Sequence, residues 1–408
     1  MQMMEQPLFG RRVRELRRAR GLSQAALAGD ELSTGYLSRL ESGARQPTER
    51  VIAYVARRLG VDRRVLEAPP SGTALARALS IASSTDGDEA VEGLLAALGK
   101  PDGGDPLLRW RALWLIARSW RKRGDTAEEL ACLEELDRLA DTLGLPELRC
   151  RVWASLARCL RSTGETGRAV DVAGEAVRLA REAGLSLPDT AAALMALVSA
   201  EAEEGRLPEA RAHVDELVGL VGECGGTTLR AEALWSAATV RFRQGHQEAA
   251  RDHIERAVQG LDSRADVTLW ARLRLAAASL YLQSGPPLTG PAAARLKEAE
   301  SALGYVGTPL LNQELLTLRA HLAFEEARFA DARAHLDELH RDEMRLTHRD
   351  RLRAGILDGR LLIVEGYEKE GRRQLEELGG KAPRADDADL PDTDNAQRLP
   401  NVARNGNI

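Results

Sequence analysis

The chain is poor in cysteine, in aromatic residues and in lysine. It has four cysteines in 408 residues, and no two of them are spaced as Cys-x-x-Cys. This scarcity excludes a disulfide framework, and the spacing excludes the common zinc and dithiol redox motifs, so we expect a reducing compartment. Aromatic residues make up 4% of the chain, and only five of the 57 basic residues are lysine. The arginine bias, with abundant alanine and glycine, is typical of a GC-rich actinobacterial genome.

Long hydrophobic runs are also missing from the sequence. No stretch approaches the ~18 uninterrupted apolar residues that a membrane-spanning helix needs. The first twelve residues lack the apolar core of a secretory leader. We therefore expect a cytoplasmic protein that has no membrane partner.

The sequence contains no motif of catalysis or metal binding. None of the seven histidines belongs to a His-Glu-x-x-His pattern, and His335 and His340 are five residues apart, not the four that align two ligands on a helix. The glycines fall between helical segments and form no phosphate-binding loop. We expect no enzymatic activity, no cofactor and no metal.

Charge is divided unevenly along the chain. Residues 1–66 carry 13 basic and 7 acidic side chains, whereas residues 67–408 carry 44 basic and 55 acidic ones. The first part is therefore basic, with a net charge of +6, and the remainder is acidic, with a net charge of −11. A basic head suits a polyanion, and the acidic body does not.

Composition and periodicity predict an all-α fold in four segments. Apolar residues recur with the period of a helix, and no segment shows the alternation of a β-strand. Residues 1–66 form a helical head, and the prolines and glycine of 67–72 make a linker. Residues 73–379 form a helical body. The polar residues 380–408 form a tail that we expect to be disordered.

The body is an internal repeat. Glycines that separate one amphipathic helix from the next recur every 40 or 41 residues from Gly124 to Gly285, and the next stands 81 residues further on. The missing member falls near Ala327. Because a short helix pair cannot bury its apolar stripe alone, the repeat predicts an α-solenoid of about eight helix pairs. The turn glycines are Gly87, Gly124, Gly164, Gly205, Gly245, Gly285 and Gly366.

The third repeat resembles the tetratricopeptide family. It has the bulky anchor, the small residue at the helix crossing, the turn glycine and the alanine of the second helix at the family's spacing. These residues are Trp153, Leu156, Ala157, Leu160, Gly164 and Ala169. The period of about 40 residues exceeds the usual 34, so the helices are expected to be longer. The resemblance implies that the first helix of each pair lines a concave face.

The head resembles the lambda-repressor-like helix-turn-helix family in its bacterial regulator form. The resemblance covers about 60 residues and rests on Gly10 to Arg17, Gly21 to Ala28 and Ser33 to Gly43, with Gln46-Pro47-Thr48 before a fourth helix. Serines at the starts of the two motif helices are expected to cap them. A small core is expected from Leu27, Leu37, Leu40, Val51 and Leu59.

This resemblance implies that the second motif helix lies in the major groove of double-stranded DNA. Thr34 and Arg39 are expected to read bases, and Gln24 to reach a phosphate or a neighbouring side chain. Six arginines between Arg11 and Arg20 would add attraction to phosphate that is independent of sequence. The alternative for each groove residue is a solvated helix face. The candidate DNA-binding residues are Gln24, Ser33, Thr34, Gly35, Tyr36, Ser38, Arg39 and Arg45.

One spacing departs from the helix-turn-helix pattern. Ser23 and Ser33 are ten residues apart, one fewer than most family members show, and no glycine stands at the usual turn position. Gly29-Asp30-Glu31-Leu32 must therefore make a tighter turn, and the recognition helix would enter the groove at a different angle.

The concave face of the body is the candidate ligand site. Its candidate residues are Arg111, Trp114, Arg118, Arg121, Arg151, Arg158, Arg161, Met195, Trp235 and Phe242, with Ala154, Leu275, His321 and Phe324 at equivalent positions. Arginine binds carboxylates in a bidentate way, so an acidic peptide or a terminal carboxylate would suit the basic end of the groove. The alternative is that these arginines pair with acidic residues of adjacent helices.

The combination of head and repeats resembles the Gram-positive peptide-sensing regulators, the RRNPP family that includes the Rgg and PlcR groups. The resemblance implies a homodimeric, sequence-specific transcription regulator whose repeats sense a short signalling peptide, as in quorum sensing. Those sensors commonly hold the peptide backbone with asparagines, and the repeats here contain only Asn312. The alternative function is an adaptor, in which the repeats recruit a partner protein and the head only tethers it to DNA.

Overall fold

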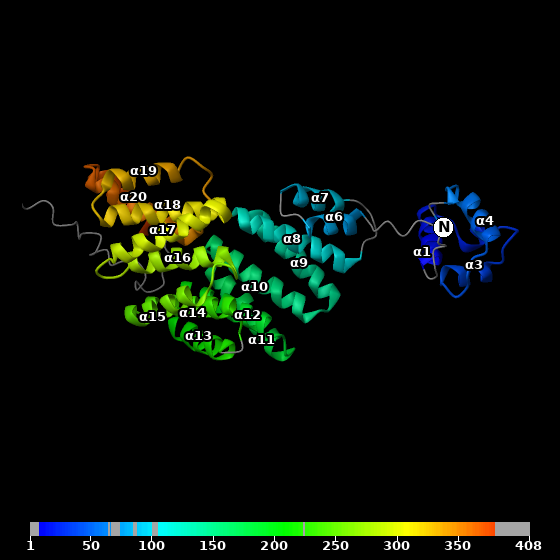
Figure 1. Ribbon diagram of the computed structural model, residues 1–408, viewed down its shortest axis with the longest axis horizontal. Coiled ribbons are helices and arrows are strands. Elements are labelled where there is room, and N and C mark those ends of the chain that lie inside the picture. Colours follow the sequence, from blue (N-terminus) through cyan, green and yellow to red (C-terminus); the bar gives the residue numbers. More distant parts are fainter. Residues whose placement is uncertain are drawn as a thin grey trace, which may run out of the picture. The chain divides into compact units, whose positions relative to one another are not determined.

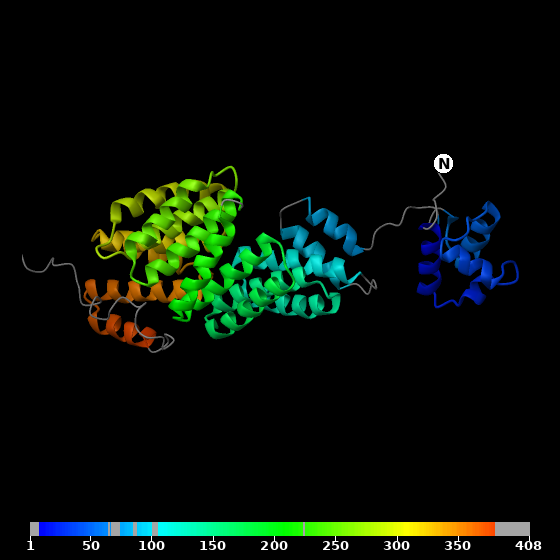
Figure 2. The same ribbon diagram turned by 90° about the horizontal axis from the view of Figure 1, so that it is seen from below.

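The computed structural model describes residues 8–63, 66, 74–84, 88–99, 105–222 and 225–379. All regular secondary structure within these ranges is helical, in 20 helices (Figures 1 and 2), which confirms the predicted all-α fold. None of these helices is long and apolar enough to span a membrane. The predicted linker 67–72 and tail 380–408 lie outside the described residues, so the domain boundaries stay predictions.

Four helices build the head around one small core. They are α1 (Leu8–Ala19), α2 (Gln24–Ala28), α3 (Thr34–Glu41) and α4 (Glu49–Leu59). The hydroxyls of Ser23 and Ser33 accept hydrogen bonds from backbone N–H groups in the first turns of α2 and α3, which confirms the two predicted caps. Thr48 caps α4 in the same way. The core contains all five predicted residues, together with others such as Phe9 and Val13.

The short turn between α2 and α3 depends on Gly29. This residue directly follows α2 and has a left-handed φ of 53°. A Cβ at this position would lie 2.5 Å from the Tyr54 hydroxyl, which donates a hydrogen bond of 2.7 Å to the Ala28 carbonyl. Only glycine tolerates both this φ and the close approach of the Tyr54 hydroxyl, so Gly29 is the glycine of this shortened turn.

The chain continues as eight successive helix pairs, as predicted. Proline stands at the first or second position of five of these helices, where no backbone donor is lost. The helices are α6 (Ala74–Ala82), α7 (Asp88–Leu98), α8 (Pro106–Arg123), α9 (Thr126–Leu143), α10 (Pro146–Thr163), α11 (Thr166–Glu182), α12 (Leu187–Glu203), α13 (Leu207–Val221), α14 (Thr227–Arg243), α15 (Gln247–Gly260), α16 (Val267–Leu282), α17 (Thr289–Val306), α18 (Pro309–Glu325), α19 (Phe329–Leu339), α20 (His348–Val364) and α21 (Glu368–Gly379).

The contacts divide the chain into two compact units. Helices α1–α4 and α6 belong to the first unit, and α8–α21 belong to the second, with α7 divided between them. Within the second unit each first helix packs against its own second helix, and from α10 onwards the first helices also touch one another in series. The first helices therefore form one continuous inner layer, as the tetratricopeptide resemblance implied.

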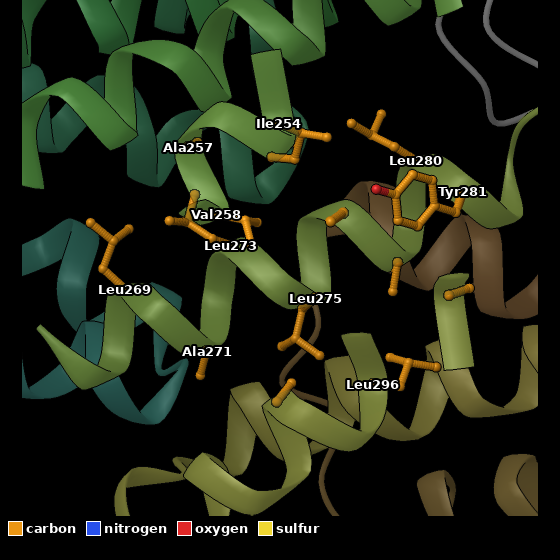
Figure 3. Close-up of a cluster of buried hydrophobic side chains, with 14 of the residues drawn as sticks. Ile254, Ala257, Val258, Leu269, Ala271, Leu273, Leu275, Leu280, Tyr281 and Leu296 are labelled. Atoms are coloured by element: carbon orange, nitrogen blue, oxygen red, sulfur yellow. The ribbon is translucent and has the colours of Figure 1, made fainter. Parts of the chain in front are cut away.

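Small and branched apolar residues hold the layers together. A cluster spanning α14 to α18 buries alanines such as Ala257 and Ala271 beside leucines such as Leu273 and Leu296 (Figure 3). Alanines without exposed surface let the helix axes approach closely, and the leucines fill the space between them. The low aromatic content of the sequence is thus compatible with a continuous core.

The C-terminal pairs of this unit return to its beginning. Helix α8 contacts α18, and α10 contacts α20, although about 200 residues separate the partners in the chain (Figures 1 and 2). The stack of pairs therefore closes on itself through its inner layer. The 40-residue repeat predicted the stack, but it contained no signal for this closure.

Left-handed residues reverse the chain within the pairs. The predicted glycines Gly124, Gly164, Gly205, Gly245 and Gly366 all have positive φ, whereas Gly285 precedes a cis peptide bond and Gly87 lies outside the described residues. Ala327, at the position where the series lacks a glycine, has a φ of 58° and is the one non-glycine residue with positive φ in the described chain. The prediction of a turn at this position is confirmed.

Replacing Ala327 with glycine should stabilise the protein. A left-handed alanine costs ~1–2 kcal/mol, which exceeds the ~0.4–1 kcal/mol that an added glycine gains in the unfolded chain. We expect Ala327→Gly to raise the free energy of unfolding by about 0.5–1 kcal/mol in urea denaturation. Ala334→Gly, at an exposed position inside α19, is the matched control and should lower it by ~0.5–1 kcal/mol. A loss of stability in both variants would contradict the left-handed conformation assigned to Ala327.

Candidate DNA-binding surface and charged interior

Helix α3 presents one solvated face. Thr34, Gly35, Ser38 and Arg39 are exposed, whereas Leu37, Leu40 and Glu41 are buried on the opposite side. Residues spaced by three or four positions share a face of a helix, so the four exposed residues form one continuous strip. The predicted base-reading residues Thr34 and Arg39 lie on this strip, in a position to meet a ligand outside the domain.

The remaining candidates in the head have partners within the domain. Ser33 caps α3 by accepting a hydrogen bond of 3.1 Å from the Tyr36 N–H. The half-buried ring of Tyr36 packs on the core, and the guanidinium of Arg45 lies 4.5 Å from its centroid. The amide of Gln24 donates a hydrogen bond of 2.9 Å to Glu41. Of the two partners expected for Gln24, a phosphate or a neighbouring side chain, the structure contains the second.

A buried ion pair fixes α3 against α1 and α2. Arg17 Nε and Nη2 donate to the two carboxylate oxygens of Glu41, at 2.6 and 2.9 Å, and Nη1 donates to the Leu22 carbonyl at 2.8 Å. Burial opposes ionisation of Glu41, but the hydrogen bonds from Arg17 and Gln24 outweigh it and lower the pKa of Glu41 below its ordinary value. The pair sets the orientation of the exposed strip.

The expectation that Arg17 attracts phosphate is therefore wrong. Its side chain is buried and bound at three atoms inside the head. Sequence reasoning overlooked Glu41, although the position was informative. An acidic residue next to Leu40 on the inward side of α3 needs a buried cation, and Arg17 stands on the inward side of α1 with Val13.

The inner layer of the second unit holds a mixed group of charges, which we call the charged interior. It consists of Arg121, Arg158, Arg161, Arg272, Glu129, Glu203, Glu232, Glu314 and Asp350, which interact electrostatically with one another. All but Glu129 stand on first helices, from α8 to α20. Side chains far apart in the chain therefore meet in one place.

Two of the predicted ligand-binding arginines are paired with acidic residues. Arg151 Nε donates to Asp189 at 2.7 Å, and Arg161 Nη1 donates to Glu203 at 2.6 Å. Each carboxylate belongs to the first helix of the next pair, α12. The alternative interpretation, pairing between adjacent helices, describes these two residues.

The other arginines have no such partner. Among the described residues, no carboxylate lies within 4.0 Å of Arg111, Arg118, Arg121 or Arg158. Arg158 Nη2 donates a hydrogen bond of 2.7 Å to the Ser155 hydroxyl, but the buried Nε of Arg158 has no hydrogen-bond partner. Burial and then the charge of Arg121 lower the pKa of Arg158 to about 9. Arg121 is exposed, yet desolvation and the nearby Arg272 lower its pKa too.

The predicted apolar ligand residues are half-buried. The ring of Trp114 stacks on Trp110 with centroids 5.2 Å apart, and the guanidinium of Arg272 lies 5.0 Å from the ring centroid of Trp235. Trp235 and Phe242 both pack against the central hydrophobic cluster, and Met195 is half-buried on α12. These residues keep part of their surface accessible, and their role in ligand binding stays a prediction.

Three further groove positions were predicted wrongly. Ala154, Leu275 and Phe324 are 2–3% exposed and belong to the packed core, so they cannot line a groove. His321 remains half-buried in the inner layer. Burial and then the charges of Arg353 and Arg360 lower the pKa of His321 to about 4, so the imidazole is neutral at physiological pH.

Neither a metal centre nor a reactive thiol stands in the described residues. No group of three or more histidine, cysteine, aspartate or glutamate side chains is arranged to hold a metal ion there. Cys132, Cys150 and Cys159 are buried and unpaired. Burial raises the pKa of Cys150 to about 11 and of the other two to about 12, so all three stay protonated.

Comparison with known proteins supports the two parts separately. Residues 8–68 match the family described as a helix-turn-helix domain. No curated protein matches the sequence. The head is therefore assigned by its family, and the repeats by their fold.

Three solved structures share the fold over nearly their whole length. A Rap protein complexed with Competence and Sporulation Factor has a TM-score of 0.59 at 9% identity and aligns 92% of this chain with 98% of that chain. The Rap conjugation gene regulator of plasmid pLS20, in complex with the Phr* peptide, has a TM-score of 0.56 at 9% identity, with 96% and 100% covered. Aspartyl phosphate phosphatase F from Bacillus subtilis has a TM-score of 0.51 at 10% identity, with 98% and 96% covered. At these identities the likeness shows a common helical-repeat fold.

Removing the carboxylate of Glu41 should destabilise the head. Glu41→Gln leaves the Arg17 charge buried without a counterion, which costs ~3–5 kcal/mol for pairs of this kind. Hydrogen exchange of the α1–α4 amides in the full chain measures this local free energy. The control is Glu31→Gln, which removes exposed pairs with Arg50 and Arg57 and should change it by less than about 1 kcal/mol.

The same pair gives the head a defined pH dependence. Because the folded pKa of Glu41 is lowered, its contribution is complete above the unfolded value of 4.5 and is lost as the pH falls through the folded pKa. The protection of α1–α4 amides should fall in acid in the wild type and fall less in Glu41→Gln. Equal acid sensitivity of both proteins would show that ionised Glu41 does not stabilise the head.

Glu314 should respond to pH in the opposite sense. Burial and then the charge of Asp350 raise its pKa to about 7, against the opposing charges of Arg272 and Arg161. A raised folded pKa gives stability that is present in acid and lost as the pH rises through 7. Because the unfolded value is 4.5, Glu314→Gln should add about 1 kcal/mol at pH 8 and almost nothing at pH 4, allowing for solvent screening. Glu338→Gln, at an exposed position on α19, should show no such difference.

Proposed function

We propose that the protein is a cytoplasmic, sequence-specific DNA-binding transcription regulator whose repeats sense a ligand, a short peptide. The observation that carries the DNA-binding part is the exposed strip of α3, held by the buried Arg17–Glu41 pair in a domain that matches the helix-turn-helix family. A short helix of these dimensions enters the major groove with its first residues at the base edges. Thr34, Ser38 and Arg39 then read bases, and Arg45 contacts the backbone.

The proposed regulator acts as a homodimer. One head offers too few base contacts for selective binding, and two heads on half-sites about one helical turn apart provide enough. The repeat unit is the larger surface available for dimerisation. Sedimentation equilibrium of the full chain, with and without DNA, tests this part separately.

The sensing part of the proposal rests on the repeat fold and the charged interior. The fold is shared with Rap proteins whose solved structures are complexes with Competence and Sporulation Factor or with the Phr* peptide. In this chain, Arg121 and Arg158 lie in the interior without a carboxylate within 4.0 Å, so they are available to a carboxylate of the ligand. A ligand that favours one curvature of the repeats would change the distance between the two heads. The proposal includes no enzymatic activity and no cofactor.

Arg39 provides the sharpest test of DNA reading. Sequencing the DNA fragments that co-purify with the protein gives a binding site, and titration of the full chain on this site gives an affinity. Loss of a bidentate base contact costs ~1–3 kcal/mol, so Arg39→Gln should weaken binding roughly 5- to 150-fold and relax selectivity at one base pair. Arg57→Gln, an equal charge change at an exposed position of α4, is the control and should retain that selectivity.

The adaptor alternative makes a different prediction for the same titrations. If the head only tethers a partner protein, Arg39→Gln and Arg57→Gln weaken binding equally on all sequences, and no common site emerges from the co-purified DNA. This result would overturn the reading role of α3. Salt titration supports the comparison, because contacts to phosphate alone lose affinity steeply and uniformly with salt.

A further inference from the structure

One segment near the C-terminal end of the repeats makes the contacts that close the stack. It runs from Glu343 to Arg353, covering the end of the α19–α20 connection and the first turns of α20. We call it the closing segment. Its residues reach pairs that begin at α8, α10, α12 and α16, up to 222 residues away in the chain.

The first contacts fall on two turn glycines. Arg345 forms an ion pair with Asp125, and its Nη1 donates to the Arg123 carbonyl at 3.2 Å. A Cβ at Gly124 would lie 3.0 Å from the Cβ of Arg345. A Cβ at Gly164 would lie 3.0 Å from the ring of His348. The backbone of these two turns is therefore in direct contact with the closing segment.

The remaining contacts extend along the inner layer. Arg349 Nη1 lies 3.8 Å from a carboxylate oxygen of Glu203, at the end of α12. Arg353 Nη2 donates to the side-chain carbonyl of Gln283, after α16, at 2.7 Å. Apart from the van der Waals contact of the His348 ring with Gly164, the cross-stack contacts named here are made by arginine side chains of the closing segment.

The closing segment is attached to its own pairs in a different way. Leu346 is buried in the apolar cluster of the C-terminal pairs. Gln313 of α18 donates to the Glu343 carbonyl at 2.8 Å and accepts from the Arg345 N–H at 2.7 Å. Apolar burial and backbone bonding are cooperative with the fold of these pairs. The cross-stack ion pairs are instead partly open to solvent, with the side chains of Arg345 and Arg349 22% and 31% exposed, so solvent screens them. The closing segment is therefore held less strongly by its cross-stack contacts than by its contacts with the C-terminal pairs.

We propose that the closing segment is a latch: its cationic contacts hold the repeat stack closed, and their release opens it without unfolding any pair. Partly exposed ion pairs are individually weak, so a few of them together lie within the range that ligand binding can shift. Opening changes the curvature of the inner layer, because α8 and α10 lose their contacts with α18 and α20.

Glu203 connects the latch to the charged interior. Its carboxylate accepts from Arg161 at 2.6 Å and also lies 3.8 Å from Arg349. Arg243 Nη2 lies 4.0 Å from the same carboxylate, so three arginines compete for it. A ligand carboxylate that binds Arg161 leaves Glu203 to Arg349 and Arg243 and tightens the latch at Arg349. This last step rests on the proposed ligand-sensing function, whereas the latch itself does not.

The latch is tested by hydrogen exchange of residues 343–353 in the full chain, with small-angle scattering as a second readout. Arg345→Gln combined with Arg349→Gln should speed the exchange of this segment at least about tenfold and raise the radius of gyration. The control is Arg178→Gln with Arg372→Gln, which removes two exposed arginines that pair within their own helices. Equal exchange and equal scattering in the two double variants would overturn the latch.

Two glycines give an independent test. Gly124 and Gly245 share a φ of +79°, but only Gly124 has a neighbour within 4 Å of a Cβ. Gly124→Ala and Gly245→Ala therefore impose the same backbone strain, and Gly124→Ala alone should speed exchange in residues 343–353. Similar exchange of residues 343–353 in both variants would count against the close approach of Gly124 and Arg345.

The link through Glu203 predicts a change of the opposite sign. Arg161→Gln frees Glu203 for Arg349 and should slow the exchange of residues 343–353. Faster or unchanged exchange would overturn the link and leave the latch in place. The DNA titrations do not depend on either result, so a failed latch is distinguishable from a failed DNA-binding function.

Discussion

Chain reversal in the left-handed conformation is the constraint on which the repeat unit depends. Each first helix must end and the chain must turn back within a few residues, so that the second helix covers the apolar stripe of the first. A residue with positive φ does this with the smallest number of residues, because it satisfies the last carbonyls of the helix while redirecting the chain. The 40-residue spacing of these turns then keeps all the first helices on one side of the stack.

The same turns take part in a second interaction. At Gly124 and Gly164 the missing side chain leaves room for the closing segment, so one residue type serves the local reversal and the contact across the stack. Gly245 has the same backbone conformation and open space around it. Local backbone geometry explains why glycine recurs at most of these turns, and the closure adds a further requirement at Gly124 and Gly164.

The sequence predicted the helices, their number and their turns because these depend on local patterns. The prediction at Ala327 succeeded although the residue is not glycine, because the spacing on both sides required a turn. The errors involve contacts between distant residues. Arg17 was assigned to phosphate because its partner Glu41 stands 24 positions away, and Leu275 was assigned to the groove because a family position does not reveal which face a longer helix buries. No short-range signal connects Arg345 with Asp125.

Charge has different roles in the two units for one physical reason, which is access to solvent. In the head, the buried Arg17 needs Glu41 and Gln24 around it, since a charge without water must find its partners in the protein. Arg39, in water, needs none and remains available to DNA.

In the repeats, the first helices enclose charges that are neither fully dry nor fully hydrated, as the lowered pKa of Arg158 and the raised pKa of Glu314 indicate. Such groups gain from a new counterion more than exposed ones do, because less water has to be displaced and the interaction is screened less. An interior of this kind is therefore suited to respond to a charged ligand, and Glu203, which touches both Arg161 and Arg349, is the point at which that response reaches the closure of the stack.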